Sequence, residues 1–329
     1  MTFLKINNLS VNYEMRRETI YAAKKININV EKGEILGLVG ESGSGKSTVG
    51  NAIINLIDEP GKVSGGSIIL DGTDIYENPE NILKLRGKKI GLIFQDPQTS
   101  LNPILTIGEQ LIETIQTHLK LNTEEAKNKA INLLKEVGIK DAETRFNNYP
   151  HQFSGGMRQR VVISLALCCE PELLIADEPT TALDVTVQAQ IIELLQDLQE
   201  QLGMAIMYIT HDLGVICEIA DVVHVMYLGK IVESASTKEL FHNPLHPYTQ
   251  RLLASIPKLG ASGKGTKLDA IRGNVPVPLN LPPQCGFQSR CNEIIENVCD
   301  LKVPDLVDMG NEHYVRCFLH SEEEEKTYA

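Results

Sequence analysis

The sequence predicts an α/β fold: a mostly parallel sheet with an antiparallel β part near the N-terminus, an inserted α-helical subdomain and a cysteine-bearing C-terminal extension. Three observations support this prediction. Short apolar runs alternate with helical stretches before residue 95 and again after residue 171, which is typical of a parallel sheet covered by helices. Residues 96–170 instead repeat apolar side chains at helical spacing. Beyond residue 257 the helical spacing ends, glycine and proline become frequent, and four cysteines follow.

Composition limits the class of protein. The 329 residues include 31 Lys and Arg against 43 Asp and Glu, a net charge of −12. This balance argues against a nucleic-acid binder, because a phosphate backbone requires a basic face. No apolar run approaches the ~20 residues that span a bilayer, and the N-terminus lacks the apolar region of a signal peptide. We therefore expect a cytosolic protein whose seven cysteines are thiols or metal ligands rather than disulfides.

The N-terminal part is expected to be rich in strands. Period-two alternation predicts strands within residues 4–7 and 26–30, and a continuous apolar run predicts a buried strand over residues 35–39. Helix-compatible residues follow at Val49–Ile57. A short strand around Ile68–Leu70, a turn at Asp71-Gly72 and a strand over Lys89–Phe94 complete this part.

A phosphate-binding loop joins the third strand to the first helix. The segment matches G-x-x-x-x-G-K-[ST] in the strand–loop–helix context that this motif requires, with Gly40, Glu41, Ser42, Gly43, Ser44, Gly45, Lys46, Ser47 and Thr48 in order. Its glycines allow a tight curl in which backbone N–H groups and a helix N-terminus point at phosphate oxygens. Lys46 would place charge at the β- and γ-phosphates, and the Ser47 hydroxyl would ligate Mg²⁺. The sequence therefore predicts a nucleotide-binding protein.

The middle of the chain changes period. Apolar side chains recur at helical spacing between residues 96 and 170, at Ile107, Leu111, Ile112 and Ile115 and again at Ala130, Leu133, Leu134 and Val137. Strand-like runs then return at Leu173–Ala176, Ala205–Thr210, Val222–Tyr227 and Lys230–Val232, with an amphipathic helix at Val187–Leu202. We expect a nucleotide-binding core at 1–95 and 171–256, a helical subdomain at 96–170, and a linker with a metal-binding extension at 257–329. The acidic end, Glu322–Glu325, is expected to be a solvated tail.

An acidic pair ends the first of the returning strands. Side chains alternate along a strand, so Asp177 and Glu178 can take different tasks. Asp177 would hold Mg²⁺ through its water shell, and Glu178 would act as general base on the attacking water. An acidic pair alone is a weak signal, but downstream of a phosphate loop it becomes strong.

With these motifs and the segment Phe153-Ser154-Gly155-Gly156-Met157, the chain resembles the ATP-binding subunit of an ATP-binding-cassette (ABC) transporter over nearly its whole length. The resemblance implies that Ser154, Gly155 and Gly156 form the signature that contacts the phosphates of ATP held by a second cassette. Phe153 and Met157 depart from the commonest form of that signature. Because each site then needs two chains, ATP would close a dimer and hydrolysis would open it.

The resemblance implies roles for four further residues. Tyr13 would stack on adenine, although local strand packing is the alternative. Gln95 would sense Mg²⁺ and the attacking water, and His211 would contact the γ-phosphate, the alternative for His211 being an ordinary strand-end histidine. Asp184, in Ala182-Leu183-Asp184, would cross the dimer interface.

Finer motifs are similar to one branch of the family, the dipeptide and oligopeptide importers. They lie at 96–103, 149–152 and 246–249. This branch implies two permease subunits, a second related ATPase subunit in a heterodimer, and an extracytoplasmic peptide-binding protein. It also implies a peripheral location at the cytoplasmic face of the membrane. Homodimers can form in isolation. The alternatives are a nickel or other small-solute importer, and a soluble ABC ATPase acting on nucleic acid or ribosomes.

Four cysteines, Cys285, Cys291, Cys299 and Cys317, lie in the extension with the spacing C-x5-C-x7-C-x17-C. This spacing does not fit the C-x2-C pairs of zinc ribbons or the common ferredoxin runs. Spacing alone leaves the metal open, with His313 and His320 near enough in sequence to replace one ligand. The branch resemblance implies a [4Fe–4S] cluster, with zinc and then free thiols as alternatives. We expect the role of the metal to be structural, since the C-terminal extension has only a small apolar core of its own.

Overall fold

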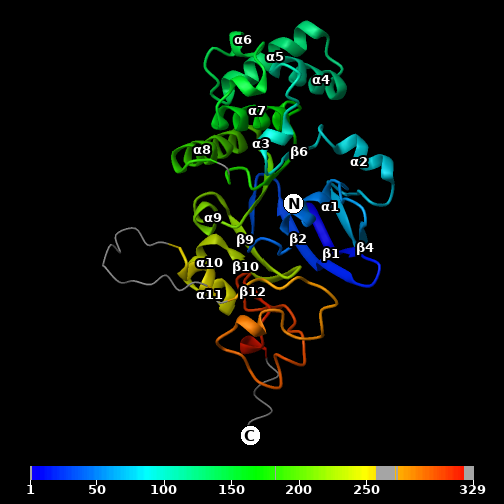
Figure 1. Cartoon of the computed structure of the whole chain (residues 1–329), viewed down its shortest axis with the longest axis vertical. Coiled ribbons are helices and arrows are strands. Elements are labelled where there is room, and N and C mark those ends of the chain that lie inside the picture. Colours follow the sequence, from blue (N-terminus) through cyan, green and yellow to red (C-terminus); the bar gives the residue numbers. More distant parts are fainter. Residues whose placement is uncertain (1, 182, 257–270, 272, 322–329) are drawn as a thin grey trace, which may run out of the picture. The chain divides into compact units, whose positions relative to one another are not determined.

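The structure is a computed structural model that describes residues 2–181, 183–256, 271 and 273–321. Ala182, most of the expected linker and the tail at Glu322–Glu325 lie outside the described residues. The chain forms two compact units. The first contains residues 31–34 and 75–209, and the second contains residues 2–30, 35–74 and the chain from residue 210 onwards (Figure 1). This division does not follow the three-part division expected from the sequence, which stays a prediction.

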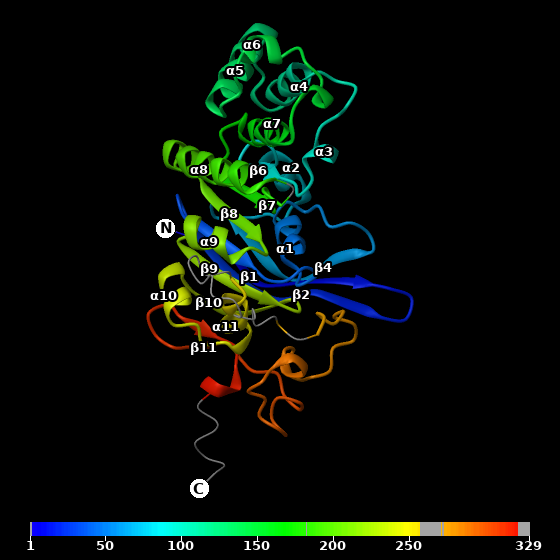
Figure 2. The same ribbon diagram turned by 60° about the vertical axis from the view of Figure 1, so that its left-hand side comes forward.

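The second unit contains the predicted antiparallel β part. Its four strands are ordered β2-β1-β4-β5, and they are β1 (Thr2–Glu14), β2 (Thr19–Glu31), β4 (Gly61–Leu70) and β5 (Thr73–Asp74). β1 and β4 pair antiparallel with Leu4 opposite Leu70 and Ile6 opposite Ile68. These four side chains are all buried, so the period-two alternation places one face of this sheet in the core. Figure 2 shows β1 and β2 as long neighbouring strands.

Further strands of the second unit bring the C-terminal extension onto the core. Their order is β11-β12-β10-β9-β3, comprising β3 (Ile35–Val39), β9 (Val222–Tyr227), β10 (Lys230–Ser236), β11 (Val307–Asp308) and β12 (Tyr314–Val315). β3 and β9 are parallel, whereas β10 is antiparallel to β9 and to β12. The pairing of Glu233 with Val315 therefore joins the extension to the sheet by main-chain hydrogen bonds.

Helices and short turns complete the second unit: α1 (Lys46–Ile53), α9 (Leu213–Ile219), α10 (Thr237–His242), α11 (Pro247–Ala254), η2 (Gln288–Arg290) and η3 (Phe318–His320). α1 is shorter than the predicted segment ending at Ile57. Asn55 adopts a positive φ of 50° just beyond it, a left-handed conformation typical of helix ends.

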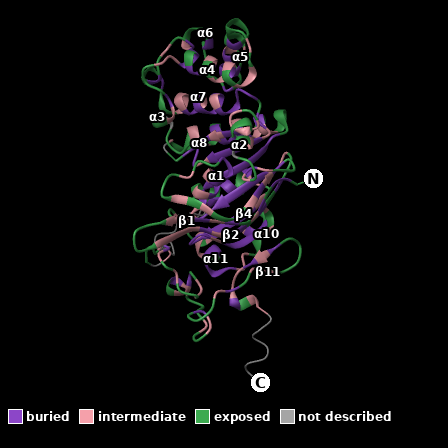
Figure 3. Ribbon diagram, turned by 90° about the vertical axis from the view of Figure 1, so that its right-hand side faces the viewer, coloured by how far each residue is buried: buried purple, intermediate pink, exposed green. Residues whose placement is uncertain are grey.

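The first unit has three parallel strands and most of the helices. β7 (Leu173–Asp177) pairs with β6 (Ile90–Ile93) and with β8 (Ala205–Thr210). The side chains of β7 and β8 are almost entirely buried. Figure 3 colours the buried residues of the chain purple. Parallel strands buried on both faces account for the continuous apolar runs seen in the sequence. Two helices of this unit lie outside residues 96–170, namely α2 (Pro79–Leu85) and α8 (Val185–Leu202).

Residues 96–170 contain helices and turns and no strand, as predicted: α3 (Pro97–Ser100), α4 (Ile107–Leu119), α5 (Thr123–Glu136), α6 (Ala142–Arg145), η1 (Pro150–Gln152) and α7 (Gly155–Leu167). α4 begins with a capping box between Thr106 and Glu109, and α5 begins with one between Asn122 and Glu125. These reciprocal bonds satisfy N–H groups that a helix start leaves unpaired. Within the part of the chain that the structure describes, no helix is long and apolar enough to cross a membrane.

Candidate nucleotide site

The phosphate loop runs from the end of β3 into α1, as its motif predicts. The Lys46 side chain is only 5% exposed and folds back over the loop. Its Nζ donates to the carbonyl oxygens of Gly40 at 2.7 Å and Glu41 at 3.1 Å. The ammonium group is thereby held at the mouth of the loop, where a phosphate would enter. Ser47, the expected Mg²⁺ ligand, is exposed.

Two glycines of the loop leave no room for a side chain. At Gly45, φ is +101° and an added Cβ would lie 1.9 Å from the carbonyl oxygen of Ala22. At Gly40, an added Cβ would lie 2.2 Å from the carbonyl oxygen of Met226. The loop is therefore pressed against β2 on one side and the end of β9 on the other, and only glycine permits this approach.

Tyr13 lies at the end of β1, opposite Gly61 of β4. An added Cβ at Gly61 would lie 2.6 Å from Tyr13 Cε1, so the half-buried ring packs over this glycine. This contact accounts for local packing of the ring. Stacking of Tyr13 on adenine stays a prediction.

The acidic pair belongs to the first unit, where β7 ends. Glu178 is 8% exposed, and its Oε2 accepts hydrogen bonds from Gln95 Nε2 at 3.1 Å and Thr181 Oγ1 at 2.8 Å. Gln95 and Glu178 are 83 residues apart in the chain, so the structure brings together two residues that the sequence assigned to one reaction. Asp177 precedes Glu178 at the end of the strand.

Glu178 has a left-handed backbone with φ of 47°, which is uncommon for a residue with a long side chain. Its N–H donates to the carbonyl oxygen of Ile209 at 2.8 Å. This bond continues the β7–β8 pairing while the chain turns, and so fixes where the carboxylate projects. Strained backbone of this kind is concentrated at functional sites.

The predicted signature begins α7. Ser154 is the N-cap residue, and its Oγ accepts from the backbone N–H of Met157 at 3.3 Å. Ser154 and Gly155 are both exposed, whereas Phe153 is buried. The N-terminus of this 13-residue helix therefore faces solvent, and helix N-termini favour anions.

Asp184 is the N-cap of α8, where its Oδ1 accepts from the N–H of Val187 at 3.0 Å. The neighbouring Val185 is 83% exposed. Capping accounts for the presence of Asp184 at this position, and a role of Asp184 in a dimer interface stays a prediction.

His211, in the second unit, is exposed after β8. It lines a cavity of about 250 Å³ with Asp212, Leu213, Leu252, Ser255 and Ile256.

The four cysteines of the extension lie close together. Burial, together with the charges of other cysteines of the same set, raises the pKa of Cys285 to about 11 and that of Cys317 to about 12. Cys291 Sγ accepts the N–H of Glu293 at 3.3 Å, and Cys299 Sγ accepts the N–H of Ile295 at 3.5 Å. Across the described residues, however, no three Cys, His, Asp or Glu side chains are placed to hold a metal ion. The expected metal site therefore lacks support from the structure.

The histidines weighed as substitute ligands have other partners. His313 Nε2 contacts the fully buried carboxylate of Glu233 at 2.8 Å, and His320 Nε2 lies 3.2 Å from the carbonyl oxygen of Leu245. Glu233 also accepts the N–H groups of Leu245 and His246. His313 therefore helps to fasten the extension to β10.

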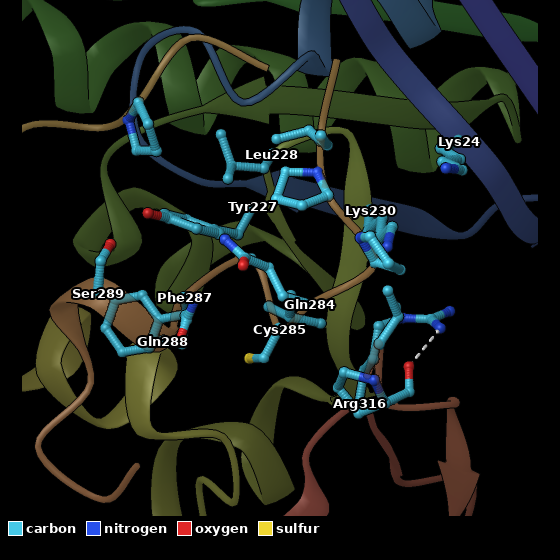
Figure 4. Close-up of a pocket in the computed structure, with 18 of the residues that line it drawn as sticks. Lys24, Tyr227, Leu228, Lys230, Gln284, Cys285, Phe287, Gln288, Ser289 and Arg316 are labelled. Carbon is cyan, nitrogen blue, oxygen red and sulfur yellow. Dashed lines mark hydrogen bonds between the residues drawn. The ribbon is translucent and has the colours of Figure 1, made fainter. Parts of the chain in front are cut away.

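A cavity of about 440 Å³ in the second unit is lined in part by the described extension, residues 273–321, which we call the cysteine arm. Figure 4 shows Lys24 and Lys230 on one side of it and Phe287 with Ser289 on the other. Burial, followed by the charges of Lys24 and Arg316, lowers the pKa of Lys230 to about 8. The cavity therefore has a basic side and an aromatic side.

The sequence did not identify several residues that hold the site. Thr181 hydrogen-bonds Glu178, and Tyr248 and Arg290 both bond Glu41 within the phosphate loop. Tyr248 belongs to the segment 246–249, whose similarity to the peptide importers signalled its importance without indicating a role. No local pattern connects Arg290 with a loop 249 residues earlier in the chain.

Comparison with known proteins is consistent with this geometry. Residues 23–181 match the family described as ABC transporter, and residues 232–299 match the family described as oligopeptide/dipeptide transporter, C-terminal region. The oligopeptide transport ATP-binding protein AppD of Bacillus subtilis is 48% identical over 98% of both chains. The dipeptide transport ATP-binding protein DppD of the same organism is 43% identical over 98% of this chain and 96% of its own. The dimeric structure of MJ0796, a bacterial ABC transporter cassette, matches with a TM-score of 0.64 and 32% identity over 71% of this chain and 98% of its own.

Proposed function

This chain belongs to the ABC transporter family, among the ATP-binding proteins of oligopeptide and dipeptide transport, and on that premise we propose how it powers peptide import by hydrolysing ATP. The full-length similarity to peptide-transport ATPases carries the proposal. Both Bacillus subtilis relatives named above are peptide-transport ATP-binding proteins, which favours a peptide substrate over nickel. The acidic charge balance counts against an action on nucleic acid.

ATP would bind with its phosphates in the loop Gly40–Thr48, where Lys46 is already positioned. Ser47, Asp177 and Gln95 would hold Mg²⁺, which neutralises charge on the phosphates when it is bound. Glu178 would take the proton of the attacking water, since its carboxylate is oriented by two hydrogen bonds. His211 would stabilise the γ-phosphate, and Tyr13 would stack on adenine.

Two cassettes would together form each complete site. The exposed N-terminus of α7, with Ser154, Gly155 and Gly156, would close on ATP held by the loop of the other cassette, and Asp184 would lie at that interface. The subunit works with membrane permeases. We propose two permeases, a related ATPase as the second cassette, a peptide-binding protein outside the cell, and a peripheral location at the cytoplasmic face.

The proposal for Glu178 is tested by the variant Glu178→Gln. An amide keeps the size of the side chain but cannot accept the proton. We expect ATP binding to persist, turnover to fall by about a hundredfold or more, and closed dimers to accumulate in size-exclusion chromatography with ATP. Glu200→Gln, an exposed change on α8, is the matched control. ATP turnover at the unaltered rate in Glu178→Gln would show that another residue is the base.

Peptide transport is tested in cells. Uptake of a labelled dipeptide should stop when Glu178→Gln replaces the native chain, and uptake of nickel should not change. Loss of nickel uptake with intact dipeptide uptake would assign the subunit to a different solute.

We also propose that Cys285, Cys291, Cys299 and Cys317 hold a [4Fe–4S] cluster, with zinc as the alternative. The proposal rests on the resemblance to the peptide-importer branch. The N–H···S bonds at Cys291 and Cys299 are of the kind that tunes iron–sulfur centres. A cluster offers each thiolate a separate iron, whereas one zinc ion requires all donors to converge within about 2.3 Å. Iron, sulfide and zinc are to be counted in anaerobically purified protein, together with Cys291→Ser. About four irons lost in the variant support the cluster, and one zinc or no metal excludes it.

A further inference from the structure

Glu41 places an acidic side chain in the loop that would bind the phosphates of ATP. Its carboxylate would repel an anionic ligand and would compete for the N–H groups that the ligand needs. Yet its backbone is central to the loop: its carbonyl oxygen accepts Lys46 Nζ at 3.1 Å and the N–H of Ser44 at 3.1 Å. An acid at this position therefore requires a structural reason.

The carboxylate of Glu41 is held by an arginine of the cysteine arm. Arg290 Nη1 donates to Oε2 at 2.7 Å, and Arg290 Nη2 donates to Oε1 at 2.9 Å. The side chain of Arg290 is 4% exposed and that of Glu41 is 27% exposed. Such a two-point contact between a guanidinium and a carboxylate is strong and fixes the orientation of both groups.

Arg290 is itself fixed in place. Its Nη2 also donates to the carbonyl oxygen of Gly273 at 3.1 Å, and its guanidinium lies 5.8 Å from the centre of the Tyr227 ring. Arg290 ends the short turn η2 directly before Cys291, whose N–H donates to the carbonyl oxygen of Gln288. These contacts fix the position of the Arg290 side chain relative to the rest of the cysteine arm.

An aromatic cluster secures the same contact. The rings of Tyr227, Tyr248 and Phe287 lie with centres 4.7–5.4 Å apart and are almost fully buried; Figure 4 shows Tyr227 and Phe287. The hydroxyl of Tyr248 accepts the N–H of Glu41 at 2.9 Å. Glu41 is thus anchored through its backbone by Tyr248 and through its side chain by Arg290.

We propose that Arg290 is a positioning residue of the phosphate loop, which neutralises and holds Glu41 so that the loop can accept the phosphates of ATP. The inference rests on the proposed ATPase function and adds to it a dependence of nucleotide affinity on the cysteine arm. If the cysteine arm undocks, the carboxylate of Glu41 loses its arginine partner, and the affinity of the loop for ATP falls. Coupling between two binding events is reciprocal, so bound ATP in turn stabilises the docked arm.

The test measures ATP binding by full-length variants in the Glu178→Gln background, which separates binding from hydrolysis. A fluorescent ATP analogue is titrated with Mg²⁺ present. Arg290→Ala is expected to raise Kd on the order of ten- to a hundredfold, the effect of one uncompensated charge near the phosphates. The loss should be smaller for ADP, which carries less charge, and smaller at high salt, which screens the repulsion.

Rescue distinguishes charge from structure. In Glu41→Gln/Arg290→Gln, neither partner is charged, and the amides can still hydrogen-bond each other. This pair should recover most of the affinity that Arg290→Ala loses. Arg316→Ala is the matched control, because Arg316 also belongs to the extension but donates to the carbonyl oxygens of Ile231 and Pro304.

Three results would overturn the proposal: unchanged affinity in Arg290→Ala, no rescue by the neutral pair, or an equal loss in Arg316→Ala. If Arg290→Ala does not fold, Arg290→Gln is compared with the neutral pair, and equal affinities in these two variants would overturn it as well. If the Glu178→Gln parent itself fails to bind the analogue, the proposed ATPase function fails first. The two failures are thus distinguishable.

Reciprocity gives an independent measurement. Amide hydrogen exchange across Gln288–Cys299 should slow when ATP binds the Glu178→Gln parent, because ATP favours the docked arm. The same ATP-dependent protection should disappear in Arg290→Ala at saturating ATP. Equal protection in both chains would show that the arm and the loop are not coupled through Arg290.

Discussion

Two buried histidines make the stability of the second unit depend on pH. His224 of β9 is 9% exposed and His246 is 2% exposed. Burial lowers the pKa of His224 to about 4, and burial with the charge of His320 lowers that of His246 to about 3. His246 Nδ1 accepts the N–H of Tyr248 at 3.0 Å, which requires that nitrogen to be unprotonated. Both rings are therefore neutral in the folded chain.

Acidification is the perturbation, and its sign follows from proton uptake. Unfolded histidines have pKa values of about 6.5, so below that pH the unfolded chain binds two protons that the folded chain does not. The free energy of unfolding then falls as the pH decreases from about 6.5 towards the folded pKa values. Each histidine contributes about 2 kcal/mol between about pH 7 and pH 5, or about 4 kcal/mol together.

Urea unfolding at several pH values measures this loss. Tyrosine fluorescence reports on the unit, since Tyr227 and Tyr248 are buried and the chain contains no tryptophan. His224→Leu fills the same buried site, and His246→Asn keeps an acceptor for the N–H of Tyr248; each should remove about half of the pH dependence. An unchanged loss of stability in the double variant would refute the assignment to these histidines.

Three further substitutions test particular contacts. Gly45→Ala should abolish ATP binding in an equilibrium titration, because its Cβ would lie 1.9 Å from the carbonyl oxygen of Ala22; binding at native affinity would contradict the loop geometry. Phe287→Ala should cost about 3–5 kcal/mol in urea unfolding, whereas Phe287→Leu should cost less than about 2 kcal/mol, and equal costs would argue against a packed ring. Thr181→Val should slow ATP hydrolysis by about tenfold without changing ATP affinity, since one hydrogen bond to the Glu178 carboxylate is lost; a weakened ATP affinity would indicate a structural role instead.

Periodicity and local motifs account for much of the fold. Strands predicted at Leu173–Ala176 and Ala205–Thr210 coincide with β7 and β8, and the apolar spacing from Ile107 predicted α4. The phosphate loop was identified from nine consecutive residues. Such features are determined by neighbours in the chain, because backbone conformation and the face that a side chain occupies depend on short spacings. The end of α1 was predicted less well, since one left-handed residue, Asn55, stops it.

The arm shows the limit of this reasoning. Spacing established that four cysteines lie near one another in sequence, but the thiols had no predictable partners, and the structure places no three ligands to hold an ion among the residues it describes. Likewise, the sequence shows that Glu41 is acidic, but no local pattern predicts that Arg290, 249 residues later, neutralises it.

The sequence by itself therefore determined the phosphate loop, the acidic pair, the order of the main strands, and the family resemblance that the comparisons confirm. The tertiary structure alone decided which distant residues support these motifs. Thr181 and Gln95 orient Glu178, and Arg290 reaches back across 249 residues to Glu41. The physical reason is that a motif is specified by local backbone geometry, whereas a buried charge is compensated by whatever partner the fold brings within hydrogen-bonding distance.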